Sequence, residues 1–198
     1  MAPPFRQVRA TATPESVRIY QAYPPEIATK ALAAQTFKSP FKRDRMTWIK
    51  TSFTWMMYRA GWGTKPGQER ILAVDLRRDG FESALGTACL SHFDRVTHSS
   101  HEEWKDALAK SRVRVQWDPE RTVALEALPW RAIQVGLERD AVDAYLDEWI
   151  LRIDDVTELA RNIKGLVDRG DIARADLIRP TELPYPLPKD ISKRIGCS

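Results

Sequence analysis

Residues 45–70 read RMTWIKTSFTWMMYRAGWGTKPGQER, and no other stretch of this 198-residue chain says more about its fold. The segment combines three tryptophans, Trp48, Trp55 and Trp62, with several cations. A buried core rarely contains so many cations, and a plain surface rarely carries so many aromatic rings. Because indole rings stack on flat ligands while arginine and lysine bind phosphate, the segment predicts a surface for a flat, anionic ligand.

The same segment predicts a strand followed by a helix. Residues 46–50 are rich in apolar and β-branched side chains, which is typical of a strand. Thr51 or Ser52 can cap a helix that Gly61 and Gly63 end. Two stripes follow helical spacing, namely Phe53, Met56, Met57 and Ala60 on one face, and Ser52, Trp55, Arg59 and Trp62 on another. We expect the first stripe to be buried and the second to line a ligand cleft. The alternative interpretation is that both tryptophans belong to the core and Arg59 only extends to solvent.

Outside residues 45–70, the sequence pattern predicts strands in the first two thirds of the chain and helices at both ends. The expected strands are residues 16–23, 70–77, 112–116, 123–127 and 132–137. The expected helices begin at Pro24 or Pro25 and cover residues 102–110, 140–153 and 155–169, with residues 80–90 left as a loop or short helix. This pattern predicts an α+β fold with a mixed β core flanked by helices and a helical C-terminal third.

The length and composition predict one soluble domain. Residues 1–14 are expected to lie loosely at the surface and residues 179–198 to form a Pro-rich extended tail, on either side of a domain spanning residues 15–178. Hydrophobic residues make up 43% of the chain and charged residues 29%, as in ordinary globular proteins. We find no apolar run that could cross a membrane and no apolar signal-peptide core, which predicts a cytoplasmic location without a membrane partner.

The net charge and the motifs of the sequence limit the classes of ligand and reaction that can be expected. The net charge of +4 and the cations between Lys38 and Lys50 suit an anionic partner, although a solvated charged surface is the alternative. There is no P-loop, no G-x-S-x-G and no cysteine or histidine spacing typical of zinc, so no metal is expected. Residues 116–121 read QWDPER, where Pro119 forces Asp118 into extended geometry and places Glu120 on a turn. Such a turn is a favourable place for chemistry, or an ordinary turn with a solvated carboxylate.

Four motifs resemble a known family. The run at residues 45–70, together with residues 17–23, 113–121 and 131–137, resembles a bacterial and fungal family catalogued as a domain of unknown function (DUF4291). The resemblance covers most of the chain, and it supplies a family label without a chemical activity.

The order of the elements is similar, more distantly, to the ADP-ribosyltransferase superfamily. Members carry an Arg or His on the first core strand, a Ser-Thr-Ser or Tyr element at the second, and a catalytic Glu late in the chain. Gln21, Thr51-Ser52 and Glu120 fall near these three places. Gln21 departs from the usual Arg or His, and Arg18 is an alternative source of that positive charge.

This second resemblance implies an ADP-ribosyltransferase-like enzyme that consumes NAD. Glu120 would stabilise the positive charge that develops on the ribose, with Gln21 as the other catalytic residue. The residues assigned to the nucleotide are Arg18, Tyr23, Trp48, Lys50, Ser52, Trp55 and Arg59.

Three functions remain open from the sequence. The first is transfer of ADP-ribose from NAD to an unidentified acceptor, with nucleic acid among those considered. The second is a nucleic-acid-binding module that stacks bases on the Trp55 and Arg59 face and binds phosphates with the cations of residues 38–50. The third is a nucleotide sensor without turnover, which the glutamine at position 21 would fit.

Overall fold

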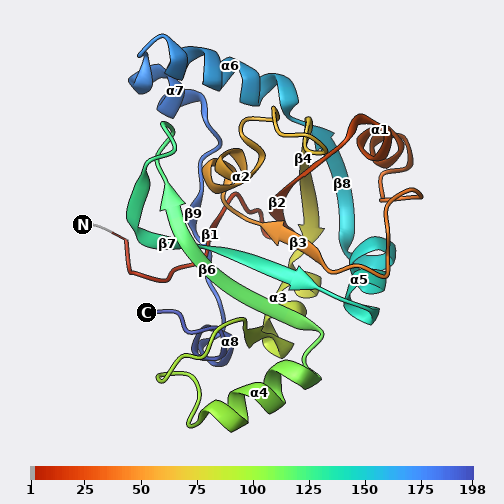
Figure 1. Cartoon of the computed structure of the whole chain (residues 1–198), viewed down its shortest axis with the longest axis vertical. Coiled ribbons are helices and arrows are strands. Elements are labelled where there is room, and N and C mark those ends of the chain that lie inside the picture. The colour runs from red at the N-terminus through yellow and green to blue at the C-terminus, as the bar shows by residue number, and fades with distance from the viewer. Residues whose placement is uncertain (1–2) are drawn as a thin grey trace.

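A seven-stranded mixed sheet forms the centre of the structure, a computed structural model that describes residues 3–198 (Figure 1). The strands are β1 (Arg9–Ala10), β2 (Ser16–Tyr23), β3 (Thr47–Lys50), β4 (Arg70–Arg77), β5 (Cys89–Leu90), β6 (Val113–Arg121), β7 (Ala127–Leu137), β8 (Ile150–Asp155) and β9 (Leu183–Pro184). The helices are α1 (Pro25–Ala34), α2 (Phe53–Ala60), α3 (Arg78–Thr87), α4 (His101–Lys110), α5 (Asp140–Ala144), α6 (Thr157–Asp168), α7 (Ile172–Ile178) and α8 (Lys189–Arg194). The order across the sheet is β5-β6-β7-β3-β2-β4-β8, and only the β5–β6 pair is parallel among the described residues. The predicted α+β class is confirmed.

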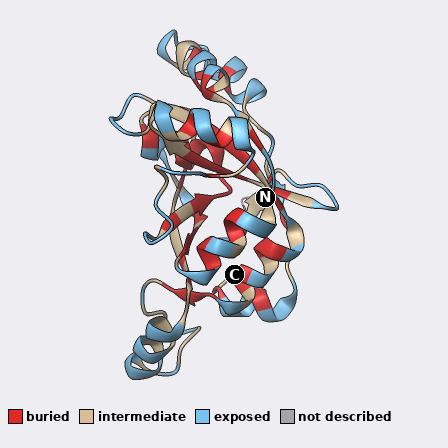
Figure 2. Ribbon diagram, turned by 90° about the vertical axis from the view of Figure 1, so that its right-hand side faces the viewer, coloured by how far each residue is buried: buried red, intermediate tan, exposed pale blue. Residues whose placement is uncertain are grey.

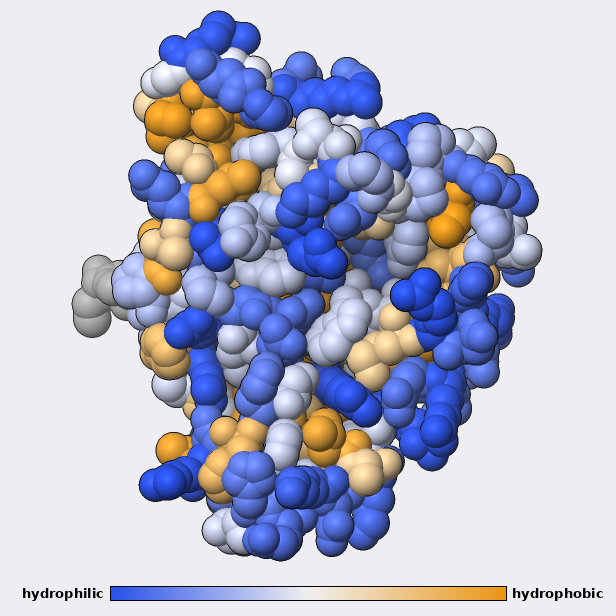
Figure 3. Space-filling model, viewed as in Figure 1, coloured by the Kyte–Doolittle hydropathy of each residue, from blue (hydrophilic) through white to orange (hydrophobic). Residues whose placement is uncertain are grey.

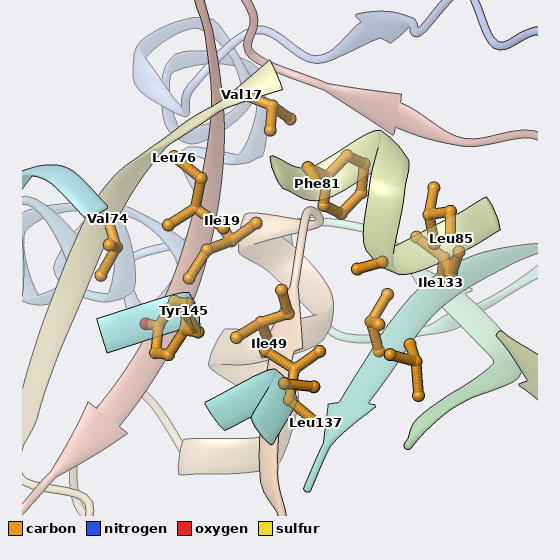
Figure 4. Close-up of a cluster of buried hydrophobic side chains, with 14 of the residues drawn as sticks. Val17, Ile19, Ile49, Val74, Leu76, Phe81, Leu85, Ile133, Leu137 and Tyr145 are labelled. Carbon is orange, nitrogen blue, oxygen red and sulfur yellow. The ribbon is translucent and has the colours of Figure 1, made fainter. Parts of the chain in front are cut away.

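Helices cover both faces of the sheet, and each covered face holds an apolar core (Figure 1, Figure 2). The larger core lies against α1, α3 and α5 and includes Val17, Ile19, Ile49, Phe81 and Tyr145 (Figure 4). The smaller core lies under α2 and α6 and includes Phe53, Met56, Met57, Ile163 and Leu166. Successive side chains of a strand point to opposite faces. Ile49 therefore joins the larger core, whereas Lys50 faces α2.

In the middle of the sheet, strands β2 and β3 are paired at a single position. Strand β2 pairs with β4 along all eight of its residues, and β3 pairs with β7 along all four of its own. Between β2 and β3 the register contains one pair, Tyr20 with Lys50. Past the Tyr20–Lys50 pair, the side chain of Gln21 on β2 supplies hydrogen bonds to β3 in place of further backbone pairing. Its Nε2 donates to Thr47 Oγ1 at 2.9 Å and to the carbonyl oxygen of Trp48 at 3.1 Å. The two halves of the sheet are thus joined by one residue pair and one buried amide.

The strand and helix predicted from residues 45–70 are confirmed. Ser52 is the N-cap of α2, because its Oγ accepts a hydrogen bond from the Trp55 amide at 3.1 Å. The helix ends at Gly61, which adopts a φ of 58°. The apolar stripe from Phe53 to Ala60 is buried as expected. For Trp62 the alternative interpretation holds, because its φ is 59° and its indole lies in the smaller core, with 6% of the residue exposed.

The predicted helix over residues 140–153 is wrong beyond Trp149. Helix α5 continues as a π-helical turn over Tyr145–Trp149, and the chain then forms strand β8 from Ile150. The apolar spacing of this segment fits a helix, but the buried edge of β4 needs backbone partners for its N–H and C=O groups. Strand β8 supplies them from Asp155 to Ile150. Long-range pairing therefore overrides the local pattern.

The strand expected over residues 132–137 is confirmed as part of the longer strand β7, whereas the strand expected over residues 123–127 is largely a turn, with Leu125 at a φ of 65°.

The described part of the N-terminal segment is packed rather than loose, and the Pro-rich tail packs with it. Strand β1 pairs with β9, and Val8 and Tyr185 are buried in the larger core. The apolar residues of the Pro-rich tail anchor it, and its last turns form α8.

A glycine on α3 allows the C-terminal half to pack. A Cβ on Gly80 would overlap the indole ring of Trp149, so this ring lies directly on the helix backbone. Gly86 lies on the same helix, and a Cβ there would meet only Ile191, at an ordinary 3.9 Å.

We expect Gly80→Ala to lower the free energy of unfolding by about 1–3 kcal/mol, the usual cost of overpacking a filled site. Gly86→Ala is the matched control and should raise it by about 0.5–1 kcal/mol, since alanine is the better helix former. Chemical denaturation of both variants measures the difference. Equal effects at the two positions would contradict the packing of Trp149 on Gly80.

Candidate functional site

Two cavities lie on either side of α2. We call the first the Glu120 cavity, with a volume of about 430 Å³ and a lining that includes Arg9, Thr54, Glu120, Arg121, Trp130, Arg179 and Glu182. We call the second the Lys50 cavity, with a volume of about 620 Å³ and a lining that includes Gln21, Tyr23, Trp48, Lys50, Arg59 and Gln116. Both volumes are within the range of small-molecule sites. The face of the molecule that carries α2 is largely hydrophilic (Figure 3).

Glu120 is a buried carboxylate held at one oxygen by three donors. Its Oε1 accepts from Ser52 Oγ at 2.7 Å, from Thr54 Oγ1 at 3.3 Å and from the Arg121 amide at 2.8 Å. The residue is 8% exposed, and the register of β6 shifts at this point, between Pro119 and Arg121. Burial raises the pKa of Glu120, while the Arg121 amide and the two hydroxyls act in the opposite direction. The carboxylate is therefore fixed in orientation.

Glu182 is the second carboxylate of this cavity. Its Oε1 accepts from the Phe53 amide of α2 at 2.7 Å. Burial, and after it the charge of Glu120, raise the pKa of Glu182 to about 8. The Glu120 carboxylate accepts three hydrogen bonds, and the Glu182 carboxylate accepts one. The pair thus carries its negative charge on Glu120 at neutral pH, while Glu182 is protonated.

Cations and an aromatic ring surround the two carboxylates. Arg9 donates from Nη2 to the carbonyl oxygen of Glu182 at 2.9 Å. The guanidinium of Arg121 lies 3.6 Å from the ring centroid of Tyr58. Arg179 and Trp130 complete the lining of this side. Asp176 also lines the cavity and forms an ion pair with Arg179. The Glu120 cavity therefore combines the Glu120 carboxylate with the guanidinium groups of Arg9 and Arg121, which suits a ligand with phosphates and a cationic centre.

The Lys50 cavity has a polar floor that runs across three strands. Gln116 of β6 pairs with Gln134 of β7, and Gln134 pairs with Lys50 of β3. Two residues along the strand, Trp48 is paired with Gly136, where a Cβ would lie 3.0 Å from its ring carbons. The glycine thus lets the indole lie against the sheet and form a wall of the cavity.

Lys50 is buried without a carboxylate partner in the described part of the chain. It is 6% exposed, its Nζ donates to the carbonyl oxygen of Trp48 at 3.3 Å, and the ammonium lies 5.3 Å from the centroid of the Trp55 ring. Burial lowers the pKa of Lys50 to about 7, and the positive charge of Arg59 acts in the same direction.

The structure divides the residues assigned from the sequence between these cavities and the protein interior. Gln21, Tyr23, Trp48, Lys50 and Arg59 meet in the Lys50 cavity. Glu120 lies in the other cavity. The residues expected around one ligand cleft are therefore divided between two cavities of the described structure, and Gln116 and Glu120 line different ones.

Three assigned residues have structural partners instead of an open cavity. Ser52 is buried between α2 and Glu120. Trp55 is 7% exposed and covers Lys50. Arg18 forms a bidentate pair with Asp75, with both distances 2.7 Å, on the face of the sheet next to β4. The amide of Gln21 is also fully engaged, because Tyr145 donates to its Oε1 at 2.7 Å.

Sequence reasoning missed Arg9, Arg179 and Glu182. Arg9 lies in the N-terminal segment expected to be loose, and Arg179 and Glu182 lie in the tail expected to be extended. The polar and apolar alternation of residues 7–10 is a strand signal that could have placed Arg9. Nothing in the local sequence marks Glu182, because its role depends on the docking of β9 against β1.

Comparison with known proteins gives a family. The family model described as "Domain of unknown function (DUF4291)" matches residues 7–185, so the chain belongs to this family, as its motifs indicated. The matched range includes the lining of the Lys50 cavity and all of the lining of the Glu120 cavity except Pro3. A comparison with curated proteins finds no match.

Three structural observations bear on partners and compartment. Within residues 3–198, no helix has the length and apolar character needed to cross a bilayer. The same residues contain no group of three or more His, Cys, Asp or Glu side chains placed to hold a metal ion. Cys89 and Cys197 are both free thiols.

We expect Glu182→Gln to stabilise the protein near pH 8. A group whose folded pKa is raised from about 4.5 to about 8 lowers stability as the pH rises between these values. The glutamine keeps an oxygen for the Phe53 amide and removes the ionisation. The gain in unfolding free energy at pH 8 should be at least about 1 kcal/mol, since one pKa unit corresponds to about 1.4 kcal/mol.

Urea denaturation at pH 5 and pH 8 measures this effect, with Glu126→Gln as the control because Glu126 is exposed. The Glu182→Gln gain should shrink at pH 5, where both forms of residue 182 are neutral. A gain that does not depend on pH would show that ionisation of Glu182 has no part in it.

Proposed function

We propose that this protein is an NAD-consuming, ADP-ribosyltransferase-like enzyme whose reaction takes place in the Glu120 cavity. The supporting observation is the geometry of Glu120, a buried carboxylate held by Ser52 at 2.7 Å inside a cavity lined by arginines. The fixed carboxylate and the Ser52 contact agree with the resemblance of the chain to the ADP-ribosyltransferase superfamily.

The chemistry needs one charge fixed next to the sugar. Cleavage of the nicotinamide–ribose bond builds positive charge on the ribose, and a carboxylate already in place stabilises it without reorganisation. Ser52, Thr54 and the Arg121 amide hold one oxygen of Glu120 and leave Oε2 for the substrate. Protonated Glu182 adds no second negative charge. Glu120 thus carries the electrostatic role in the proposed reaction.

The nucleotide would be held by residues different from those assigned on sequence alone. Arg9 and Arg121 line the same cavity as Glu120 and supply partners for a pyrophosphate, and Arg179 lies beside them in an ion pair with Asp176. Trp130 offers an aromatic surface for a flat ring. Gln21 has no role in this proposal, because its amide joins β2 to β3.

The competing function, nucleic-acid binding through a Trp-Arg face, receives less support from the geometry. Trp55 and Trp62 are 7% and 6% exposed, so neither ring presents an open face on which a base could stack. The cations at the mouth of the Glu120 cavity remain available to an anionic acceptor, and nucleic acid is one such acceptor.

We expect Glu120→Gln to lower NAD turnover by about 100-fold or more, because it removes the charge and keeps the shape of the site. NAD affinity should change little, since phosphate and stacking contacts dominate ground-state binding. Glu182→Gln is the matched control and should keep turnover within a few-fold. Nicotinamide release, measured in the presence of cell extract as a source of acceptor, gives turnover.

Results opposite to these for Glu120→Gln would favour the competing function, nucleic-acid binding. Unchanged turnover in Glu120→Gln would exclude Glu120 from the mechanism. If the protein only binds nucleic acid, Glu120→Gln should slightly strengthen that binding, and Arg179→Ala should reduce the slope of binding against salt by about one. Calorimetry with NAD and a salt titration with single-stranded DNA separate these cases.

A further inference from the structure

The Lys50 cavity is a built site that the proposed reaction does not use. Its central group is a lysine that is 6% exposed and faces the cavity. In the part of the chain that the structure describes, one hydrogen bond of 3.3 Å to the Trp48 carbonyl serves its Nζ. A buried ammonium with so few partners is costly, so the position favours the neutral amine.

We propose that the Lys50 amine is the nucleophile of a second site, where it condenses with the carbonyl group of a flat, phosphorylated ligand. This inference is independent of the NAD reaction, because Lys50 and Glu120 line different cavities.

The charges around Lys50 make its amine reactive. Arg59 faces it from α2 and, after burial, is the second cause that lowers the pKa of Lys50 to about 7. Asp118 faces it from β6 and is occupied, because Gln116 and Gln134 donate their Nε2 groups to it at 2.8 and 2.5 Å. Desolvation beside a second cation is an established way to activate a lysine nucleophile. Burial and Arg59 outweigh the charge of Asp118, which raises the pKa of Lys50, so the neutral amine is far more available than in an exposed lysine.

The walls of the cavity define the class of ligand. Arg45, Lys42 and Arg59 lie at its lining and suit a phosphate group. The indole of Trp48 lies against Gly136 and gives a flat apolar wall, which suits a planar ring. A volume of about 620 Å³ admits one aromatic ring with its phosphate. The ligand class is thus an aromatic phosphate ester with an aldehyde or ketone.

The reaction needs no further reagent. The lone pair of the neutral Nζ attacks the carbonyl carbon, and a proton moves from nitrogen to the carbonyl oxygen to give a carbinolamine. Loss of that hydroxyl as water forms the C=N bond of an imine. One carbonyl compound and one amine thus yield one imine and one water. Neither oxidation nor reduction occurs.

The test uses pyridoxal 5′-phosphate as a probe, followed by borohydride, which reduces the imine and fixes the label. Peptide mass spectrometry then locates the labelled lysines. We expect Lys50 to be labelled at least about tenfold more than Lys65 at pH 7.5, because the neutral fraction of an ordinary lysine there is roughly a thousandth. Lys65 is a matched comparison, since it is exposed and also lies beside an aromatic ring, 6.0 Å from the centroid of Tyr58.

Two further measurements complete the test. Labelling of Lys50 should rise with a midpoint near pH 7, and pyridoxal without the phosphate should label it more slowly than the phosphorylated probe. Lys65→Met should leave the Lys50 label unchanged, and unfolding in urea should abolish the preference for Lys50. Labelling that follows surface exposure, or equal rates with both probes, would overturn the proposal. Both outcomes are read on the wild-type chain, so they do not depend on the folding of a Lys50 variant.

Discussion

The junction between β2 and β3 is the constraint on which the rest of the structure depends. One residue pair joins the two halves of the sheet, and the Gln21 amide supplies the hydrogen bonds that a longer ladder would have made. Each such bond contributes about 1 kcal/mol, but a buried group left without a partner costs more. The same divergence of the strands makes room for the Lys50 cavity, which Gln21, Thr47 and Trp48 line. The divergence of β2 from β3 therefore accounts both for the short pairing between these strands and for the Lys50 cavity.

Helix α2 separates the two cavities and organises both. Its N-cap, Ser52, uses one hydroxyl to accept from the Trp55 amide and to donate to Glu120. The Phe53 amide of its first turn binds Glu182. A helix N-terminus favours negative charge, so the eight-residue helix supports an ionised Glu120 while its Trp55 ring covers Lys50 on the other side. A disturbance of this helix would change both cavities together.

The features that could be predicted from the sequence are those that depend on residues close together in the chain. Capping at Ser52, the stop at Gly61 and the buried stripe of α2 follow from local periodicity, and they hold in the structure. The failures all involve distant partners: β8 forms because the edge of β4 needs it, and Glu182 reaches Phe53 across 129 positions. The division of the candidate site has the same origin. Glu120 and Lys50 sit on strands separated by β7, a fact of strand order that no local pattern contains.

Two ionisable groups of opposite type line the cavities on either side of α2, and both lower the stability of the fold. Lys50 is buried and Glu182 is partly buried. Stability is lost at Glu182 as the pH rises from about 4.5 towards 8, and at Lys50 as the pH falls from about 10.5 towards 7. Apolar residues of similar size would avoid both losses. Groups with strongly shifted pKa values that line cavities are a mark of functional sites, because catalysis needs protonation states that solvent-exposed groups do not offer. The shifted pKa values of Glu182 and Lys50 therefore agree with the chemistry that we propose for the two cavities.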